Sequence, residues 1–121
     1  MRRGDSRLGS VARRAIERAW QSDELAVSAI SFWEVAMLVD KGRIRLSDDV
    51  HTWRREHLEQ GVVEIPVDGD IGIRAAGLTD FHADPADRLI VATALASHLL
   101  VTSDRRILGW SGSLNRLDAT D

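Results

Sequence analysis

Residues 84–104 read DPADRLIVATALASHLLVTSD and predict a helix followed by a strand. Pro85 stands just after an aspartate, and this order is favoured where a helix begins. Residues 89–96 are almost entirely apolar, so we expect this helix to be mostly buried. The apolar residues 99–102 then predict a strand with an acid two positions beyond its end. A buried helix that leads into a buried strand is typical of a parallel α/β sheet.

The rest of the chain continues this alternation of strands and helices. Residues 25–30 are a short, largely apolar run that predicts a strand covered on both faces. Residues 62–67 predict a second strand, in which Pro66 indicates an edge or a strand end. Helices are predicted over residues 8–20 with Asp5 or Ser6 as cap, from Ser31 to about Asp40, from Ser47 or Asp48 to Leu58, after Asp68 or Asp70, and over residues 105–110. Residues 111–121 hold too little apolar surface to assign. The alternation predicts an α/β fold with parallel strands and helices on both faces.

The composition indicates one globular domain spanning residues 1–121. No apolar run approaches the roughly 20 residues that cross a bilayer, and no secretory signal opens the chain, so we expect a cytoplasmic protein without a membrane partner. With no cysteine, any metal must be held by oxygen or imidazole ligands. The net charge of −3 neither requires nor excludes a nucleic-acid substrate, although all but one of the 16 basic residues are Arg.

Three acids are expected at one edge of the sheet, because ligand sites in such folds lie beyond the carboxyl ends of the strands. Glu34 follows the first strand by four residues, Asp104 follows the third by two, and Asp87 lies in the first turn of the buried helix. Carboxylates packed this closely repel one another and need a compensating cation. Mg²⁺ or Mn²⁺ prefers such oxygen ligands, and an ion held in this way activates water for attack on a phosphodiester. The pattern therefore predicts metal-dependent hydrolysis of a nucleic-acid backbone.

Each acid also has a purely structural interpretation. Ser31 and Glu34 match the S/T-x-x-E capping box, in which the glutamate satisfies a free N–H at the helix start. Asp87 complements the helix dipole with or without a metal. Asp104 is placed either to cap the short helix that follows or to pair with Arg105 or Arg106. If all three acids serve in this way, the chain is an α/β module without a metal site.

Other candidate constellations are weaker. The four histidines lack metal-ligand spacing and are expected to be exposed or partly buried; they are His51, His57, His82 and His98. Trp20, Trp33 and Trp53 are expected in the core rather than as platforms for stacking bases. Asp68 and Asp70 are expected as helix caps.

Three stretches resemble the PIN-domain toxins of the VapC type. They are residues 26–36 (AVSAISFWEVA), 84–94 (DPADRLIVATA) and 100–104 (LVTSD). The resemblance runs from about Asp5 to Trp110. It implies a Rossmann-like, three-layer α/β fold, Mg²⁺- or Mn²⁺-dependent endoribonuclease activity, an RNA substrate, inhibition by a VapB-type antitoxin, and a homodimer. It also implies that Glu34, Asp87 and Asp104 are the catalytic metal ligands.

The resemblance departs from the family at the amino end. Members of the family begin with a central apolar strand that ends in an Asp, and no such strand precedes the first helix here; Asp5 follows Arg2-Arg3-Gly4 and is not assigned that role. We expect open backbone edges on the strands that would flank it. The alternative function is a catalytically impaired PIN remnant that binds the antitoxin. Arg88, Arg105 and Arg106 are candidates for phosphate contacts, and Arg88 is equally placed for a salt bridge to Asp84 or Asp87.

Overall fold

The computed structural model describes residues 8–121, which form six helices and four short strands. In chain order these are α1 (Ser10–Gln21), β1 (Ala26–Ser28), α2 (Ala29–Asp40), α3 (Val50–Glu59), β2 (Val63–Ile65), α4 (Gly69–Ala76), α5 (Pro85–Ala94), β3 (Leu100–Thr102), α6 (Arg105–Leu108) and β4 (Arg116–Asp118). All three predicted strands are present, each shorter than its apolar run. The fourth strand lies in the tail that the sequence pattern left unassigned.

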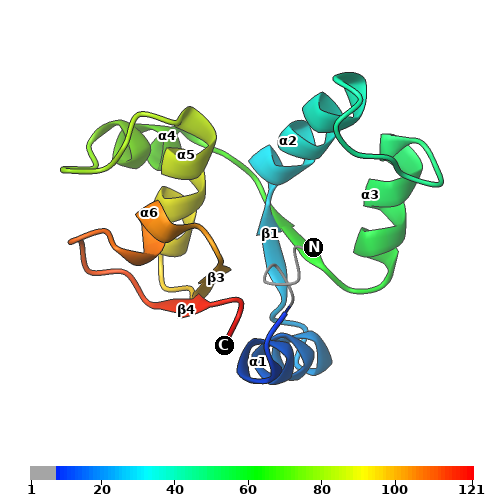
Figure 1. Cartoon of the computed structure of the whole chain (residues 1–121), viewed down its shortest axis with the longest axis horizontal. Coiled ribbons are helices and arrows are strands. Elements are labelled where there is room, and N and C mark those ends of the chain that lie inside the picture. The colour runs from blue at the N-terminus through cyan, green and yellow to red at the C-terminus, as the bar shows by residue number, and fades with distance from the viewer. Residues whose placement is uncertain (1–7) are drawn as a thin grey trace.

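The strands form two parallel pairs, β1 with β2 and β3 with β4. The predicted α/β architecture with parallel strands is therefore confirmed. Figure 1 shows β1 and β2 beside α2 and α3, whereas β3 and β4 lie with α4, α5 and α6 in the other half of the molecule. Within residues 8–121 the two pairs are not hydrogen-bonded to each other, so β1 and β3 each present one open edge. These open edges agree with the expectation from the sequence.

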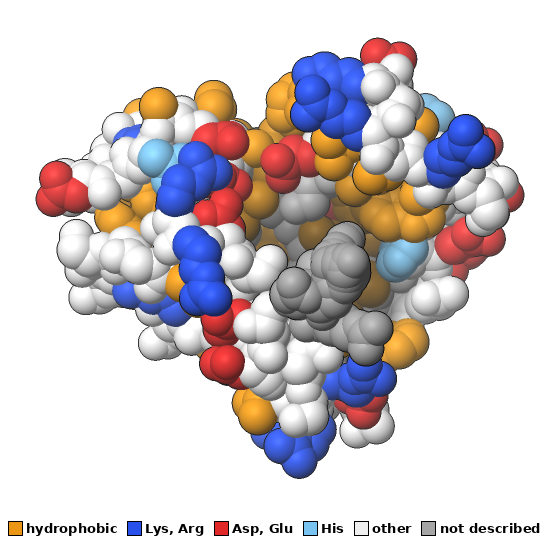
Figure 2. Space-filling view, viewed as in Figure 1, with side chains coloured by type: hydrophobic (Ala, Val, Ile, Leu, Met, Phe, Trp, Pro, Cys, Tyr) orange, Lys and Arg blue, Asp and Glu red, His pale blue; other side chains and the backbone are white. Residues whose placement is uncertain are grey.

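A groove of about 770 Å³ separates the two strand pairs. Strand β1 lines one wall and strand β3 lines the other, and Ala15 and Ile16 of α1 also contribute to it. Asp87 and Asp104 line this groove as well. The hollow at the centre of the space-filling view has acidic side chains on both rims (Figure 2).

The core is concentrated around α5. Val91 and Ala92 have no exposed surface, which confirms the predicted buried helix. One cluster places Ala92 against Ile71 and Ala75 of α4, and a second places Val91 against Ile107 and Trp110. Helix α5 is thus fixed on two sides, and its first turn is carried on a rigid support.

The helix starts differ from the predictions in several places. The proposed caps Asp5 and Ser6 lie outside the described residues, and Gly9 occupies the cap position of α1 without a side-chain hydrogen bond. Asp49, rather than Ser47 or Asp48, caps α3. Asp68 caps α4 as expected, through a hydrogen bond from the N–H of Ile71. No helix within residues 8–121 combines the length and apolar character needed to cross a lipid bilayer.

Candidate functional site

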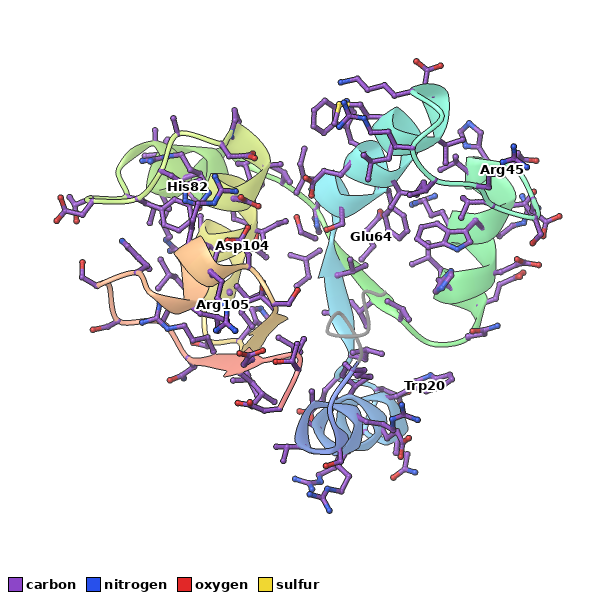
Figure 3. The ribbon with its side chains drawn as sticks, viewed as in Figure 1. Trp20, Arg45, Glu64, His82, Asp104 and Arg105 are labelled. Carbon is purple, nitrogen blue, oxygen red and sulfur yellow. The ribbon has the colours of Figure 1, made fainter. Side chains whose placement is uncertain are left out.

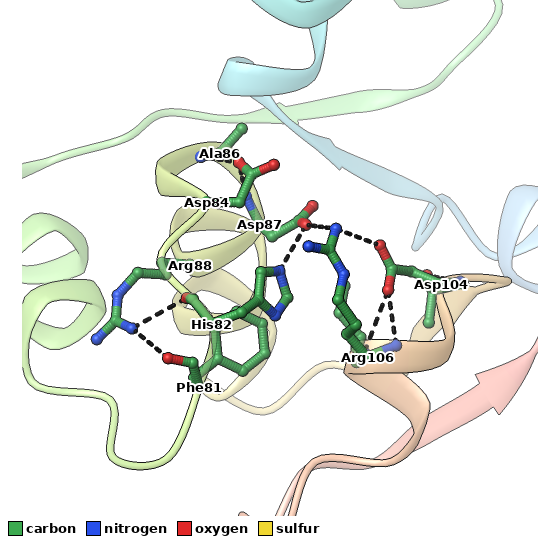
Figure 4. Close-up of polar contacts among 10 residues, drawn as sticks. Phe81, His82, Asp84, Ala86, Asp87, Arg88, Asp104 and Arg106 are labelled. Atoms are coloured by element: carbon green, nitrogen blue, oxygen red, sulfur yellow. Dashed lines mark hydrogen bonds and ion pairs between the residues drawn. The ribbon is translucent and has the colours of Figure 1, made fainter.

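Asp87 is held at the start of α5 by the local sequence. Pro85 occupies the first turn, and the carboxylate of Asp84 accepts hydrogen bonds from the N–H groups of Ala86 (3.0 Å) and Asp87 (3.4 Å). The side chain of Asp87 is only 15% exposed. Its Oδ2 accepts hydrogen bonds from Nε2 of His82 at 2.8 Å and from Nη2 of Arg106 at 3.3 Å (Figure 4). One carboxylate oxygen therefore has two nitrogen partners.

Asp104 caps the short helix α6 and also faces Arg106. Its Oδ1 accepts from the N–H of Arg106 at 2.8 Å and from that of Ile107 at 3.4 Å, while Oδ2 lies 3.4 Å from Nη2 of Arg106. Burial acts to raise the pKa of Asp104, but the hydrogen bonds from Arg106 and Ile107 outweigh it, and the pKa lies below its ordinary value. Both structural interpretations of this acid, the cap and the Arg106 pair, are confirmed. In both roles, Oδ2 of Asp104 stays at the edge where Asp87 lies.

Glu34 does not serve as a helix cap. Helix α2 begins at Ala29, and Ser28 caps it by accepting from the N–H of Ile30. The predicted capping box with Ser31 is therefore wrong, because the chain enters the helix directly from β1 and Glu34 lies a full turn inside it. Burial, followed by the negative charges of Asp87 and Asp84, raises the pKa of Glu34. The negative charges at the start of α5 therefore oppose the ionisation of Glu34.

The three predicted acids thus converge to different degrees. Asp87 and Asp104 share one guanidinium nitrogen, and Glu34 interacts with Asp87 through its charge. Within residues 8–121, no three acid, His or Cys side chains lie close enough together to enclose a metal ion. The arrangement is an acidic edge in which a cationic side chain lies between two of the carboxylates.

The donor set of this edge fits a hard divalent cation. It consists of carboxylate oxygens, and Mg²⁺ is typically held by one or two carboxylates while it keeps several waters. Asp87 and Asp104 already neutralise a shared positive group through their Oδ2 atoms. These two residues would hold such an ion, and Glu34 lies near enough for its charge to act on Asp87.

Arg88 serves a structural purpose that the sequence did not reveal. Its guanidinium donates to five backbone carbonyls at 2.8–3.3 Å: those of Ala75, Ala76, Leu78, Phe81 and His82. The predicted salt bridge to Asp84 or Asp87 is wrong, since the guanidinium points to the loop before α5 instead (Figure 4). Because Arg88 fixes this loop, it positions His82 against Asp87.

The other two candidate phosphate contacts differ from each other. The side chain of Arg105 is 85% exposed and lies 3.7 Å from Asp118 of β4, on the β4 side of α6 (Figure 3). The side chain of Arg106 is 59% exposed and faces the acids. The sequence indicated that arginines follow Asp104 directly. It did not indicate that Arg106, rather than Arg105, would face the acids.

The tryptophan predictions are partly wrong. Trp20 and Trp33 are 45% and 54% exposed, whereas Trp110 is the buried tryptophan among the described residues. Trp53 is partly buried and makes an edge contact with Phe32. Helical spacing indicated a shared face, but α1 and α2 are not covered on that face by the described part of the chain.

A family model described as PIN domain matches residues 4–109. Ribonuclease VapC22 of Mycobacterium tuberculosis (strain ATCC 25618 / H37Rv) is 43% identical over 103 residues, which cover 84% of this chain and 76% of that protein. No solved structure matches the chain significantly.

Proposed function

The chain belongs to the PIN-domain family, in its VapC type, and from this premise we propose that it is the endoribonuclease toxin of a VapB–VapC pair. Its substrate is RNA, and its reaction is the metal-dependent hydrolysis of a phosphodiester bond. The ribonuclease name of the relative and the acidic edge described above support the same chemistry.

The observation that carries this proposal is the approach of Asp87 and Asp104 to one nitrogen of Arg106. The two carboxylates come from the starts of different helices, 17 positions apart in the chain, and each is oriented by its own set of hydrogen bonds. Acids kept this close without a cation would repel each other, so their environment favours a positively charged occupant. Two aspartates that only cap their helices have no need to share a cation.

Mg²⁺ or Mn²⁺, when bound, supplies Lewis acidity toward water and a phosphodiester. Asp87 and Asp104 would hold the ion, and Glu34 would add negative charge from helix α2. His82 and Arg88 support these acids indirectly. Arg88 fixes the loop that carries His82, and His82 orients Asp87.

Two protein partners belong to the same proposal. A VapB-type antitoxin inhibits the toxin, and two copies of the chain form a homodimer. Exposed apolar side chains, among them Trp33 and Ile73, are available for such contacts.

The test is cleavage of a mixed-sequence RNA panel by the purified protein with Mn²⁺, with Mg²⁺ or with EDTA. We expect cleavage with either ion, none with EDTA, and a loss of about 100-fold or more in Asp87→Asn and Asp104→Asn. Asp49→Asn is the matched control, since Asp49 is also a helix cap but lies on α3 and asparagine caps equally well. Cleavage that persists in EDTA, or that survives both substitutions, would contradict the proposal.

A further inference from the structure

Arg106 places a positive charge where the proposed metal ion would lie. Its Nη2 is 3.3 Å from Oδ2 of Asp87 and 3.4 Å from Oδ2 of Asp104 (Figure 4). A divalent ion bound through these two oxygens would take the place of the guanidinium nitrogen, so the guanidinium and the ion cannot occupy this position together.

The side chain of Arg106 is held loosely enough to leave. It is 59% exposed, and its contacts with the two carboxylates are at the long end of the hydrogen-bond range. Partly exposed ion pairs of this kind contribute little to stability. Arg88 and Arg116, in contrast, bind backbone carbonyls at distances as short as 2.8 Å and 2.7 Å and are parts of the framework.

We propose that Arg106 is the internal counter-ion of the metal-free site, and that it is displaced from between Asp87 and Asp104 when a divalent cation binds. This inference rests on the proposed function, because it concerns the same acids. Arg106 is therefore a positioning residue: it keeps the two acids together in the absence of the ion and lowers the apparent affinity for the ion by competing with it.

The first test measures Mn²⁺ binding by calorimetry in the absence of RNA. We expect Arg106→Gln to bind Mn²⁺ about three- to tenfold more tightly than the wild type, because the competing cation is gone. Arg105→Gln is the matched control, since it removes the same charge from the adjacent position, where the side chain faces Asp118 instead. Its affinity should stay within about twofold of wild type. Arg106→Lys keeps the charge and should restore an affinity close to that of the wild type.

A second test needs no substitution. Phenylglyoxal modifies accessible arginines, and mass spectrometry resolves Arg105 from Arg106. We expect Mn²⁺ to accelerate the modification of Arg106 relative to that of Arg105, because binding of the ion releases the guanidinium. A purely structural role for Arg106 predicts no acceleration and weaker, not tighter, metal binding in Arg106→Gln.

The outcomes separate this inference from the proposed function. If the wild type binds Mn²⁺ and cleaves RNA, but Arg106→Gln binds the ion no more tightly than Arg105→Gln, the counter-ion role is overturned and the nuclease proposal stands. If the wild type binds no divalent cation, both are overturned.

Discussion

Glu34 and Glu64 are the same residue type in different surroundings, and their pKa values are shifted in opposite directions. The carboxylate of Glu64 accepts from Arg54 at 2.6 Å and 2.8 Å, and these hydrogen bonds, against a smaller effect of burial, lower its pKa. Glu64 lies on β2, away from Asp104 (Figure 3). Glu34 has a raised pKa, and no hydrogen bond to its carboxylate is seen within the described residues. An acid kept near other acids without compensation is typical of a functional site rather than of a stabilising contact.

We therefore predict that Glu34→Gln stabilises the metal-free protein. Because the pKa of Glu34 is raised on folding, its favourable contribution exists only below the unfolded pKa, about 4.5, and is lost as the pH rises through the folded value. At pH 7.5 in EDTA, the substitution should raise the Tm by about 1–3 °C, measured by circular dichroism. The gain should disappear near pH 4.

Glu64→Gln is the control with the opposite sign. The lowered pKa of Glu64 makes its contribution present above about pH 4.5 and lost as the pH falls through the folded value. The substitution should therefore lower the Tm at pH 7.5, with a difference that shrinks in acid. A Glu34→Gln protein that is less stable than wild type at pH 7.5 would show that the charge of Glu34 is compensated.

The sequence predicted which acids lie at the edge but not what they contact. Asp87 and Asp104 follow from the rule that the carboxyl ends of parallel strands share one edge. The bond between His82 and Asp87 depends on the path of the loop before α5, which the five carbonyl contacts of Arg88 determine. Spacing along the chain carries no information about such a loop, so neither the bond from His82 to Asp87 nor the carbonyl contacts of Arg88 were predicted.

At the scale of the element, helix caps were predicted correctly where the sequence around the helix start favours one cap residue. Asp84 with Pro85, and Asp68, cap as expected. Helix α2 begins two residues before the predicted Ser31, because Ala29 and Ile30 fit a buried helix as well as a buried strand. Strand β4 was missed because its three residues carry only one apolar side chain, and its pairing with β3 is supplied by tertiary structure.

Asp104 combines a cap with a site residue, and the two roles are separable by substitution. Asparagine caps as well as aspartate, so Asp104→Asn should lower the Tm only through the lost charge interaction with Arg106, and by less than Asp104→Ala, while it removes the charge from the acidic edge. Asp104→Ala should lose the cap as well and destabilise the protein by about 1 kcal/mol, measured by urea denaturation.

Mn²⁺ binding provides the second measurement on the same two variants. Both should bind the ion more weakly than wild type, although the alanine variant is destabilised more. Equal destabilisation by Asn and Ala would indicate that the charge, rather than the cap, holds α6 in place.

At the scale of the molecule, the sequence predicted the parallel pairing and open strand edges, and the structure of residues 8–121 agrees. It did not predict that the two halves would enclose a groove of about 770 Å³. The size of a groove depends on how α1 and α5 pack around it, and pattern alone does not fix that packing. The groove brings Asp87 and Asp104 to the same wall as the open edge of β3.

The backbone of β3 gives a direct way to observe that open edge. The N–H of Leu100 donates to the carbonyl of Asn115 at 2.9 Å, and the carbonyl of Thr102 accepts from the N–H of Ala119 at 2.8 Å. Residues 100 and 102 therefore turn toward β4, and alternation along the strand turns the N–H of Val101 toward the groove. In the described part of the chain, that N–H has no strand partner.

We predict that the amide of Val101 exchanges with deuterium about tenfold or more faster than that of Leu100, measured by NMR on the full chain at constant pH. Both residues belong to one short strand, so global unfolding affects them equally and only the local hydrogen bond differs. The amide of Leu95, which donates to Val91 at 2.9 Å at the end of α5, reports the stability of the core in the same sample. If Val101 is as protected as Leu100, another strand pairs with this edge in solution. Repeating the measurement at several protein concentrations then distinguishes a strand of the same chain, whose protection is constant, from one supplied by a second copy, whose protection increases with concentration.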